Sequence, residues 1–274
     1  MKILITGAGG WLGRYLAAAL ESTHNVVAVD RQALDLTNAA QVAQHFKIFS
    51  YDAVINCAAS GRYTPAVEDW NIVNNNLAAA INLMCHQDSF GQLINIGTGA
   101  EFDIALPIDS VDEDEIYHRN PKQSYGLSKN IIARCMANYS NCYTLRLFGC
   151  FDSGEDSGRL LKKFHSVLAS GQEFNLQDRP FDMISAEDFT TVVRSVLAGE
   201  IFDNNLNCVY AEKTRLSDIS KLYCDSHALD SSLLKITGVG LCYTGSGDRL
   251  SKYDLPLHGL TDSITHYQYE TQSK

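Results

Sequence analysis

A tyrosine and a lysine one helical turn apart are the residues of this chain best suited to proton transfer. Tyr125 and Lys129 lie in a segment whose pattern predicts a helix over residues 124–139, so their side chains share one face. An ammonium group beside a phenol favours the phenolate and is expected to lower the tyrosine pKa towards neutrality. Tyr125 could then protonate a carbonyl oxygen or accept a proton from an alcohol. Because this spacing is common in helices, the interpretation depends on the neighbouring features.

Thr98 supplies a hydroxyl directly after a predicted strand over residues 92–97. The carboxyl ends of strands in an open parallel sheet face the ligand crevice. A hydroxyl there can hydrogen-bond a substrate oxygen and polarise a carbonyl group. The alternative is that Thr98 only caps a turn.

A glycine-rich turn lies between the first predicted strand and the first predicted helix, with the sequence Thr-Gly-Ala-Gly-Gly-Trp-Leu-Gly over residues 6–13. Gly7 permits the tight turn, Gly10 lets the backbone approach a pyrophosphate, and Gly13 lets helix and strand pack closely. The N–H groups and the partial positive charge at a helix start bind phosphate. The turn therefore predicts a dinucleotide cofactor.

Asp30 ends the second predicted strand, where dinucleotide-binding proteins place an acidic residue. A carboxylate at this position accepts hydrogen bonds from ribose hydroxyls and repels a 2′-phosphate, which favours NAD. Arg31 favours the other cofactor, because a guanidinium can bind the 2′-phosphate of NADP. We expect NAD, with NADP as the alternative. A solvated aspartate without a ligand role is the third interpretation.

The elements that would position these residues alternate along the first two-thirds of the chain. Short apolar runs predict buried strands, and longer amphipathic stretches predict helices between them. This alternation implies βαβ units and a doubly wound parallel sheet, an α/β fold. The predicted strands are 2–6, 26–30, 53–57, 92–97 and 142–148, and the predicted helices are 11–21, 38–49, 71–87 and 124–139.

Beyond about residue 149 the alternation becomes less regular. Helices are predicted over 159–170, 186–198 and 217–224 and strands over 173–177 and 206–211, with weak signals after residue 230. We predict a dinucleotide-binding (Rossmann) domain over residues 1–150. Residues 151–274 are expected to form mainly a small substrate lobe, with 173–198 returning to the Rossmann core.

The composition excludes several classes of protein. The formal net charge is −10 and no basic cluster is longer than two residues, so no nucleic-acid partner is expected. No apolar run approaches the roughly 18 residues of a membrane span, and the absence of an export signal indicates a cytoplasmic location. The eight cysteines lack paired spacing, and no two histidines have metal-binding helical spacing. Neither disulfides nor a metal site are therefore expected.

In order and spacing these residues resemble the extended short-chain dehydrogenase/reductase family, most of whose characterised members act on nucleotide-linked sugars. The resemblance extends to about residue 224 and is specific up to about residue 148. It implies that Thr98, Tyr125 and Lys129 form the catalytic set, with Lys129 also binding the nicotinamide ribose. The remaining matches are to cofactor-binding positions: Gly7, Gly10, Trp11, Leu12, Gly13, Asp30, Arg31, Asp35, Leu36, Ala58, Ala59 and Asn76.

Two departures from the family pattern limit the expected reaction. Related 4,6-dehydratases have Asp-Glu where this chain has Gly99 and Ala100, so dehydration is not expected. UDP-galactose 4-epimerases have asparagine and arginine, which help to hold the diphosphate, where this chain has Gly149 and Phe181. Candidates for the missing positive charge on the substrate side are Arg159 and Arg179, followed by Lys162 and Arg249.

The resemblance implies a ketoreductase, closest in pattern to sugar-nucleotide 4-ketoreductases such as dTDP-4-dehydrorhamnose reductase and GDP-fucose synthase. An epimerase that retains NAD is the second hypothesis, because it uses the same residues. A dinucleotide-sensing regulator without activity is the third, although such a protein is expected to lack the tyrosine or the lysine.

A homodimer is also expected, as in many relatives, through a four-helix interface formed by the two helices 71–87 and 124–139. The prediction depends on their apolar residues Leu77, Ile81, Leu83, Ile131 and Ile132.

Overall fold

Six strands form one parallel sheet in the computed structural model, which describes residues 1–61 and 69–269. The order of the strands is β10-β6-β4-β3-β1-β2. In β1, Ile3, Leu4 and Ile5 are all fully buried, as expected for a parallel sheet covered on both faces. The strands are β1 (Lys2–Thr6), β2 (Asn25–Val29), β3 (Tyr51–Asn56), β4 (Phe90–Thr98), β6 (Cys142–Leu147) and β10 (Asn205–Asn207).

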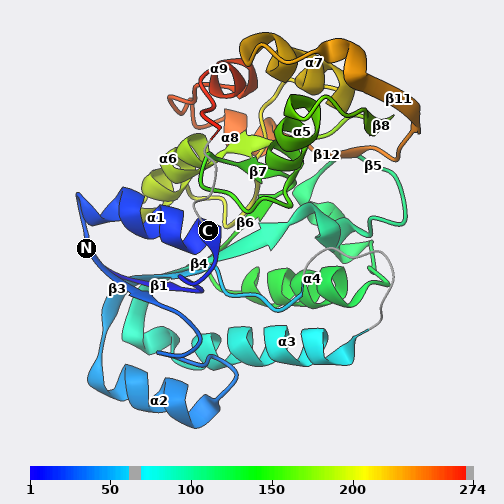
Figure 1. Cartoon of the computed structure of the whole chain (residues 1–274). Coiled ribbons are helices and arrows are strands. Elements are labelled where there is room, and N and C mark those ends of the chain that lie inside the picture. The colour runs from blue at the N-terminus through cyan, green and yellow to red at the C-terminus, as the bar shows by residue number, and fades with distance from the viewer. Residues whose placement is uncertain (62–68, 270–274) are drawn as a thin grey trace.

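Helices cover both faces of this sheet (Figure 1). On one face α1 (Trp11–Glu21) contacts α6 (Ala186–Leu197). On the other face α3 (Trp70–Met84) packs between α2 (Ala39–Ile48) and α4 (Ser124–Met136). The predicted doubly wound α/β fold is confirmed.

The chain reverses its direction across the sheet at β1. The strand β2 pairs with one edge of β1, whereas β3 pairs with the other and leads on to β4 and β6. The loops that follow β1 and β3 therefore diverge, and an open α/β sheet binds its ligands at such a switch point. The glycine-rich turn follows β1 directly.

A smaller C-terminal lobe lies above the carboxyl ends of the strands (Figure 1). Its core contains Phe164, Leu176 and Tyr223, and β8 pairs with β11 away from the large sheet. The predicted segment 173–198 is thus divided, since β8 belongs to the lobe and α6 to the sheet.

The further strands and helices are β5 (Ile108–Val111), β7 (Cys150–Phe151), α5 (Leu160–Ala169), β8 (Phe174–Asp178), β9 (Ile184–Ser185), α7 (Leu216–Ser226), β11 (Leu234–Val239), β12 (Tyr243–Gly245), α8 (Asp248–Ser251) and α9 (Leu260–Thr265). The 3₁₀ helices are η1 (Gln87–Ser89), η2 (Gly99–Phe102), η3 (Glu113–Tyr117) and η4 (Ser231–Leu233).

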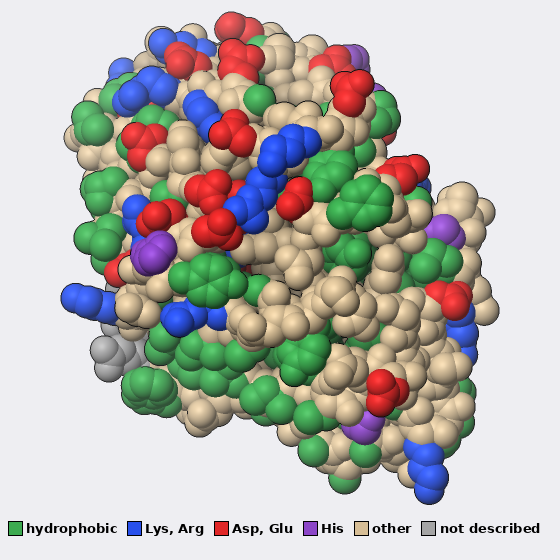
Figure 2. Space-filling model, turned by 180° about the vertical axis from the view of Figure 1, so that it is seen from behind, with side chains coloured by type: hydrophobic (Ala, Val, Ile, Leu, Met, Phe, Trp, Pro, Cys, Tyr) green, Lys and Arg blue, Asp and Glu red, His purple; other side chains and the backbone are tan. Residues whose placement is uncertain are grey.

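The molecule has two tiers, the sheet tier, which is the large sheet with its helices, and the C-terminal lobe. Their surfaces differ. Seen from behind, acidic and basic side chains alternate over the lobe, whereas hydrophobic side chains gather below, over α3 and α4 (Figure 2). Ile81 is 54% exposed, but Leu83 and Ile132 are buried in the core, so these two are not available to a partner. The homodimer stays a prediction that depends on Leu77, Ile81 and Ile131. Within the described ranges no helix has the length and apolarity needed to cross a bilayer.

Candidate active site

Two adjoining cavities follow the carboxyl edge of the sheet. The smaller has a volume of about 270 Å³ and the larger about 650 Å³, and both are lined by Gly7, Gly10, Cys57 and Ala59. Together they form one cleft from the loop after β2 to the C-terminal lobe. Of the residues predicted to bind cofactor or substrate, only Lys129 and the further charge candidates Lys162 and Arg249 do not line this cleft. The smaller cavity adds Asp30, Arg31, Asp35, Leu36, Ala58 and Asn76, and the larger adds Trp11, Leu12, Gly13, Thr98, Tyr125, Arg159 and Arg179.

The glycine-rich turn brings three segments of backbone into close contact. Gly7 has φ +71°, and a β-carbon there would lie 2.5 Å from the backbone nitrogen of Ala58. A β-carbon on Gly13 would lie 2.5 Å from the carbonyl oxygen of Gly7. Among the described residues no side chain caps the start of α1 at Gly10. The first N–H groups of the helix therefore remain available to an anion in the cleft, which fits a pyrophosphate.

The far end of the smaller cavity carries two acidic side chains. Asp30 accepts hydrogen bonds from the backbone N–H groups of Gln32 (3.0 Å) and Ala33 (2.9 Å). Asp35 accepts from the hydroxyl of Thr37 at 2.7 Å and from its N–H at 3.0 Å, which lowers the pKa of this carboxyl group. The guanidinium of Arg31 lies 3.4 Å from Asp35, so the charge that could attract a 2′-phosphate is shared with a carboxylate.

Asn76 links the smaller cavity to α4, the helix that carries Tyr125. Its side chain accepts a hydrogen bond from the N–H of Ser60 (2.6 Å) and donates one to the hydroxyl of Ser128 (2.9 Å). The Ser128 hydroxyl in turn donates to the carbonyl oxygen of Tyr125 (2.8 Å). These contacts connect α3 with the first turn of α4 and fix the backbone that carries Tyr125.

Thr98 ends β4 and caps the short helix η2. Its hydroxyl accepts a hydrogen bond from the N–H of Ala100 (3.3 Å), and its own N–H donates to the Glu101 carboxylate (2.9 Å). The capping role considered from the sequence is therefore present. Thr98 and Tyr125 line the same cavity, and the Thr98 side chain lowers the pKa of the Tyr125 phenol. The two meet because α4 begins against η2, where a β-carbon on Gly126 would lie 2.5 Å from the carbonyl oxygen of Ala100.

The expected lowering of the Tyr125 pKa is wrong for the chain by itself. Burial raises the pKa of Tyr125 to about 12 and the negative charge of Glu101 adds to this, while hydrogen bonding to Thr98 and the charge of Arg159 oppose it. Desolvation disfavours the phenolate more than the cations nearby stabilise it. Tyr125 therefore carries its proton at neutral pH.

The amine of Lys129 points into the protein rather than into the cleft. The side chain is 4% exposed, and its Nζ donates a hydrogen bond to the carbonyl oxygen of Ile96 at 2.8 Å. Burial lowers the pKa of Lys129, against the charges of Glu101 and Cys57. Sharing a helix face brought the two side chains to one region. The shared face did not determine where the ammonium group points, because that direction depends on its hydrogen bond to the buried carbonyl oxygen of Ile96.

A buried ion pair below Thr98 was not anticipated from the sequence. The guanidinium of Arg146 lies 2.6 Å from the Glu101 carboxylate, and both side chains are fully buried. Arg146 also donates to Asn205 (2.9 Å) and Asn207 (3.0 Å), so it joins η2 to β10. The signal available was a single arginine inside the apolar strand Cys142–Leu147, because a buried charge requires partners.

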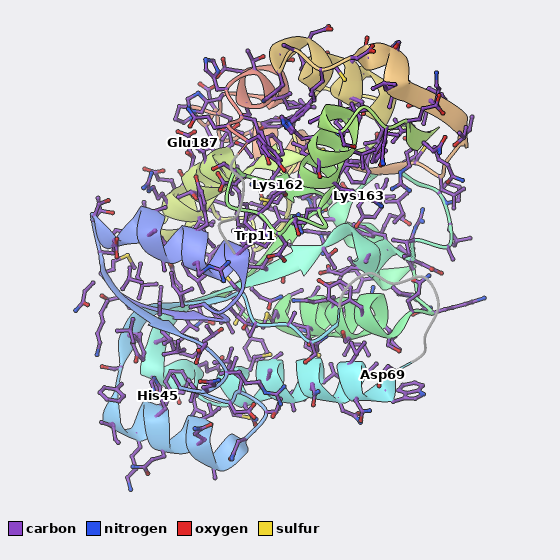
Figure 3. The ribbon with its side chains drawn as sticks, viewed as in Figure 1. Trp11, His45, Asp69, Lys162, Lys163 and Glu187 are labelled. Carbon is purple, nitrogen blue, oxygen red and sulfur yellow. The ribbon has the colours of Figure 1, made fainter. Side chains whose placement is uncertain are left out.

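Two arginines face the larger cavity from the lobe. Arg159 pairs with Glu155 at 2.9 Å and lies over the ring of Trp11, 4.9 Å from its centroid. Trp11 opens α1 between the large sheet and the lobe (Figure 3). Arg179 lies over the ring of Phe181, 5.2 Å from its centroid, and its buried Nε has no hydrogen-bond partner among the described residues. Lys162 and Arg249 do not line this cavity.

Packing also fills the space at Gly99 and Gly149, two positions where the chain departs from the family pattern. A β-carbon on Gly99 would lie 2.5 Å from the ring of Phe148 and 2.9 Å from that of Tyr243. A β-carbon on Gly149 would lie 2.9 Å from the carbonyl oxygen of Asp182. Neither position has room for a side chain in this structure.

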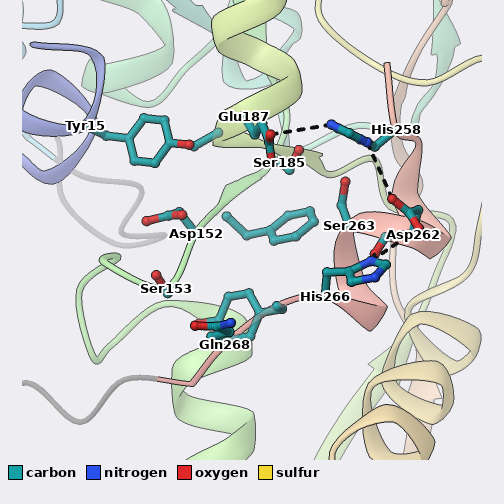
Figure 4. Close-up of a pocket in the computed structure, with 13 residues that line it drawn as sticks. Tyr15, Asp152, Ser153, Ser185, Glu187, His258, Asp262, Ser263, His266 and Gln268 are labelled. Atoms are coloured by element: carbon teal, nitrogen blue, oxygen red, sulfur yellow. Dashed lines mark hydrogen bonds and ion pairs between the residues drawn. The ribbon is translucent and has the colours of Figure 1, made fainter. Parts of the chain in front are cut away.

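A separate cavity of about 380 Å³ lies between α1, α6 and α9. His258 lies 3.5 Å from both Glu187 and Asp262, and His266 lies 3.2 Å from Asp262 (Figure 4). None of the predicted site residues lines this cavity.

A family model, the NAD dependent epimerase/dehydratase family, matches residues 3–198. The chain belongs to this family. The resemblance to extended short-chain dehydrogenases/reductases is thereby confirmed. Members of the family use NAD or NADP. No curated protein matches the chain.

Solved structures of several activities share the fold. A dTDP-4-dehydrorhamnose reductase from Clostridium acetobutylicum is 22% identical, with TM-score 0.79 over 97% of this chain and 98% of that chain. A GDP-mannoheptose C4 reductase from Campylobacter jejuni with NADP bound is 18% identical, with TM-score 0.79 over 96% of each chain. A dTDP-glucose 4,6-dehydratase from Bacillus anthracis with NAD is 13% identical, with TM-score 0.77 over 96% and 95%. At these identities the likeness shows the fold and does not select one reaction.

Proposed function

We propose that the protein reduces a keto group on a nucleotide-linked sugar, with Tyr125 as proton donor and NADH as hydride donor. The observation that carries the proposal is the single cleft that joins the glycine-rich turn to Thr98 and Tyr125. A phenol with a pKa of about 12 retains its proton at neutral pH, as a general acid must.

In this mechanism Thr98 and Tyr125 hydrogen-bond the carbonyl oxygen and orient the sugar. Reduced nicotinamide, when bound, supplies the hydride to the carbonyl carbon. Tyr125 then gives its proton to the oxygen, which becomes a hydroxyl, and Tyr125 regains a proton from solvent. Lys129 is proposed to bind the nicotinamide ribose, as the family resemblance implies, by turning its amine from the carbonyl oxygen of Ile96 into the cleft, where its charge would stabilise the transient phenolate.

The packing at two glycines favours reduction over the other reactions of the family. Dehydration needs an acid–base pair, and no side chain fits at Gly99. The diphosphate-binding asparagine of 4-epimerases has no room at Gly149. We propose instead that Arg179 and Arg159 bind the substrate diphosphate, because both arginines line the larger cavity and the Nε of Arg179 has no partner among the described residues.

NADH is the proposed cofactor rather than NADPH. Asp30 lines the smaller cavity and would repel a 2′-phosphate. The guanidinium of Arg31 is already paired with Asp35 at 3.4 Å, which weakens its attraction for that phosphate.

The test is consumption of NADH in the presence of dTDP- and GDP-linked 4-keto-6-deoxyhexoses. We expect catalytic turnover with at least one of them, and Tyr125→Phe should lower kcat by about 10²–10⁴ while NADH binding is retained. Tyr139→Phe, which changes an exposed tyrosine, is the matched control and should behave as wild type.

Near-full activity of Tyr125→Phe would overturn the assigned proton donor. Protein that is purified with stoichiometric bound NAD, and that interconverts sugar isomers without net cofactor consumption, would instead be an epimerase.

A further inference from the structure

Tyr243 brings a third hydroxyl group into the larger cavity from a part of the chain without a sequence signal. It begins the short strand β12, which pairs with β5, and it lines the cavity together with Thr98 and Tyr125. Its backbone is fixed on both sides, since its N–H donates to Pro180 (3.0 Å) and its carbonyl oxygen accepts from Asp182 (3.1 Å).

The ring of Tyr243 is held by aromatic neighbours. It stacks on Phe181, with centroids 5.5 Å apart and planes at 26°, and meets the edge of Phe148 at 5.2 Å. A β-carbon on Gly99 would lie 2.9 Å from Cζ, the ring carbon that bears the hydroxyl. The end of the ring that bears the hydroxyl therefore lies beside Gly99, next to Thr98, where related dehydratases carry their acidic residue.

The hydroxyl of Tyr243 is electrostatically coupled to Thr98 and Tyr125, with which it lines one cavity. Thr98 lowers the pKa of both phenols, that of Tyr125 and that of Tyr243. Burial raises the pKa of Tyr243, and the charges of Tyr125 and Glu101 add to this against the effect of Thr98 and of Arg179. The phenol thus stays protonated at neutral pH, so it can donate a hydrogen bond but cannot remove a proton from carbon.

We propose that Tyr243 contacts the substrate and determines specificity, by donating a hydrogen bond to the hydroxyl oxygen on the carbon next to the keto group. Oxygens on neighbouring sugar carbons lie about a hydrogen-bond length apart (~2.8 Å), and Tyr243 lines the same cavity as Thr98 and Tyr125. When Thr98 and Tyr125 hydrogen-bond the keto oxygen, the oxygen on the neighbouring carbon lies within reach of the Tyr243 hydroxyl. The inference depends on the proposed ketoreductase function.

The experiment compares two substrates: the best 4-keto sugar of the panel above, and its analogue without the hydroxyl next to the keto carbon. Wild type should prefer the first by about 10-fold in kcat/KM, the value of one well-formed hydrogen bond. In Tyr243→Phe, which retains the ring packing, this preference should fall to about 1. The ratio is measured within one protein sample, so it does not depend on the folded fraction.

Tyr253→Phe is the matched control. It removes a tyrosine hydroxyl that donates to Asp203 at 2.7 Å and does not line the cleft, and it should leave the preference at about 10-fold. NADH binding should stay within about twofold of wild type in both variants.

An unchanged preference in Tyr243→Phe overturns the inference, whether its overall activity is retained or reduced, because a purely structural role affects both substrates equally. If wild type consumes NADH with neither substrate class, the proposed ketoreductase function fails, and the role of Tyr243 fails with it.

Discussion

The two tiers of the molecule contribute to the cleft in different ways. At the glycine-rich turn the sheet tier contributes backbone, since Gly7, Gly13 and Ala58 lie so close together that no side chain fits between them. The lobe contributes side chains that extend over the cleft, Arg159, Arg179 and Tyr243. A backbone cradle suits a cofactor shared by many enzymes, whereas side chains can be exchanged to suit one substrate.

This comparison can be tested most strongly at the glycine turn. Gly7→Ala adds a methyl group 2.5 Å from a backbone nitrogen at φ +71°, so overpacking of about 1–3 kcal/mol and backbone strain of about 1 kcal/mol should combine. We expect NADH affinity to fall by about 100-fold or more, measured by fluorescence titration.

The matched control for this change is Gly171→Ala in the lobe. Gly171 has a similar backbone, φ +75°, but a β-carbon there meets nothing within 4 Å. It should lose about 1 kcal/mol of stability through strain alone and bind NADH as wild type does. Equal loss of NADH binding in both variants would contradict the backbone-cradle interpretation.

A second, smaller effect is a dependence of the protein's stability on pH that arises in the lobe. Burial raises the pKa of Glu155 to about 7 against the charge of Arg159, whereas its unfolded value is near 4.5. A carboxyl group whose pKa is higher in the folded state stabilises the fold most at low pH, and this contribution is lost as the pH rises from about 4.5 to 7. The loss should amount to at most about 3 kcal/mol.

Urea denaturation across this pH range measures the effect. In Glu155→Gln, which cannot ionise and can still hydrogen-bond Arg159, the decline attributable to Glu155 should disappear. A pH profile identical to that of wild type would mean that the folded-state pKa of Glu155 is ordinary.

The smallest expected effect concerns the choice of cofactor, which should belong to the sheet tier alone. Arg31 is exposed and its ion pair with Asp35 is worth about 1 kcal/mol or less. Arg31→Ser should raise the KM for NADPH about 3–10-fold and leave the KM values for NADH and for the sugar within about twofold. A wild-type preference for NADPH over NADH would contradict the assignment of Asp30.

Local patterns were sufficient for the fold and for much of the cleft. The glycine turn, the strand-end Asp30 and the alternating strands and helices depend on residues close together in sequence, where backbone conformation and periodicity act directly. The predicted helix 124–139 ends at Met136 and the predicted strand 206–211 shortens to Asn205–Asn207, because the ends of elements depend on tertiary hydrogen bonds.

The sequence by itself determined most of the chemical groups that this protein brings to the cleft, but only the tertiary structure added Tyr243 and decided how the groups are directed. Spacing placed Lys129 on the face of Tyr125, yet its amine donates to the carbonyl oxygen of Ile96. The pairing of Glu101 with Arg146 and the closure of Gly99 by Tyr243 join residues 45 and 144 positions apart. Such contacts depend on how distant segments pack and which polar groups lose water together, and no local pattern encodes either.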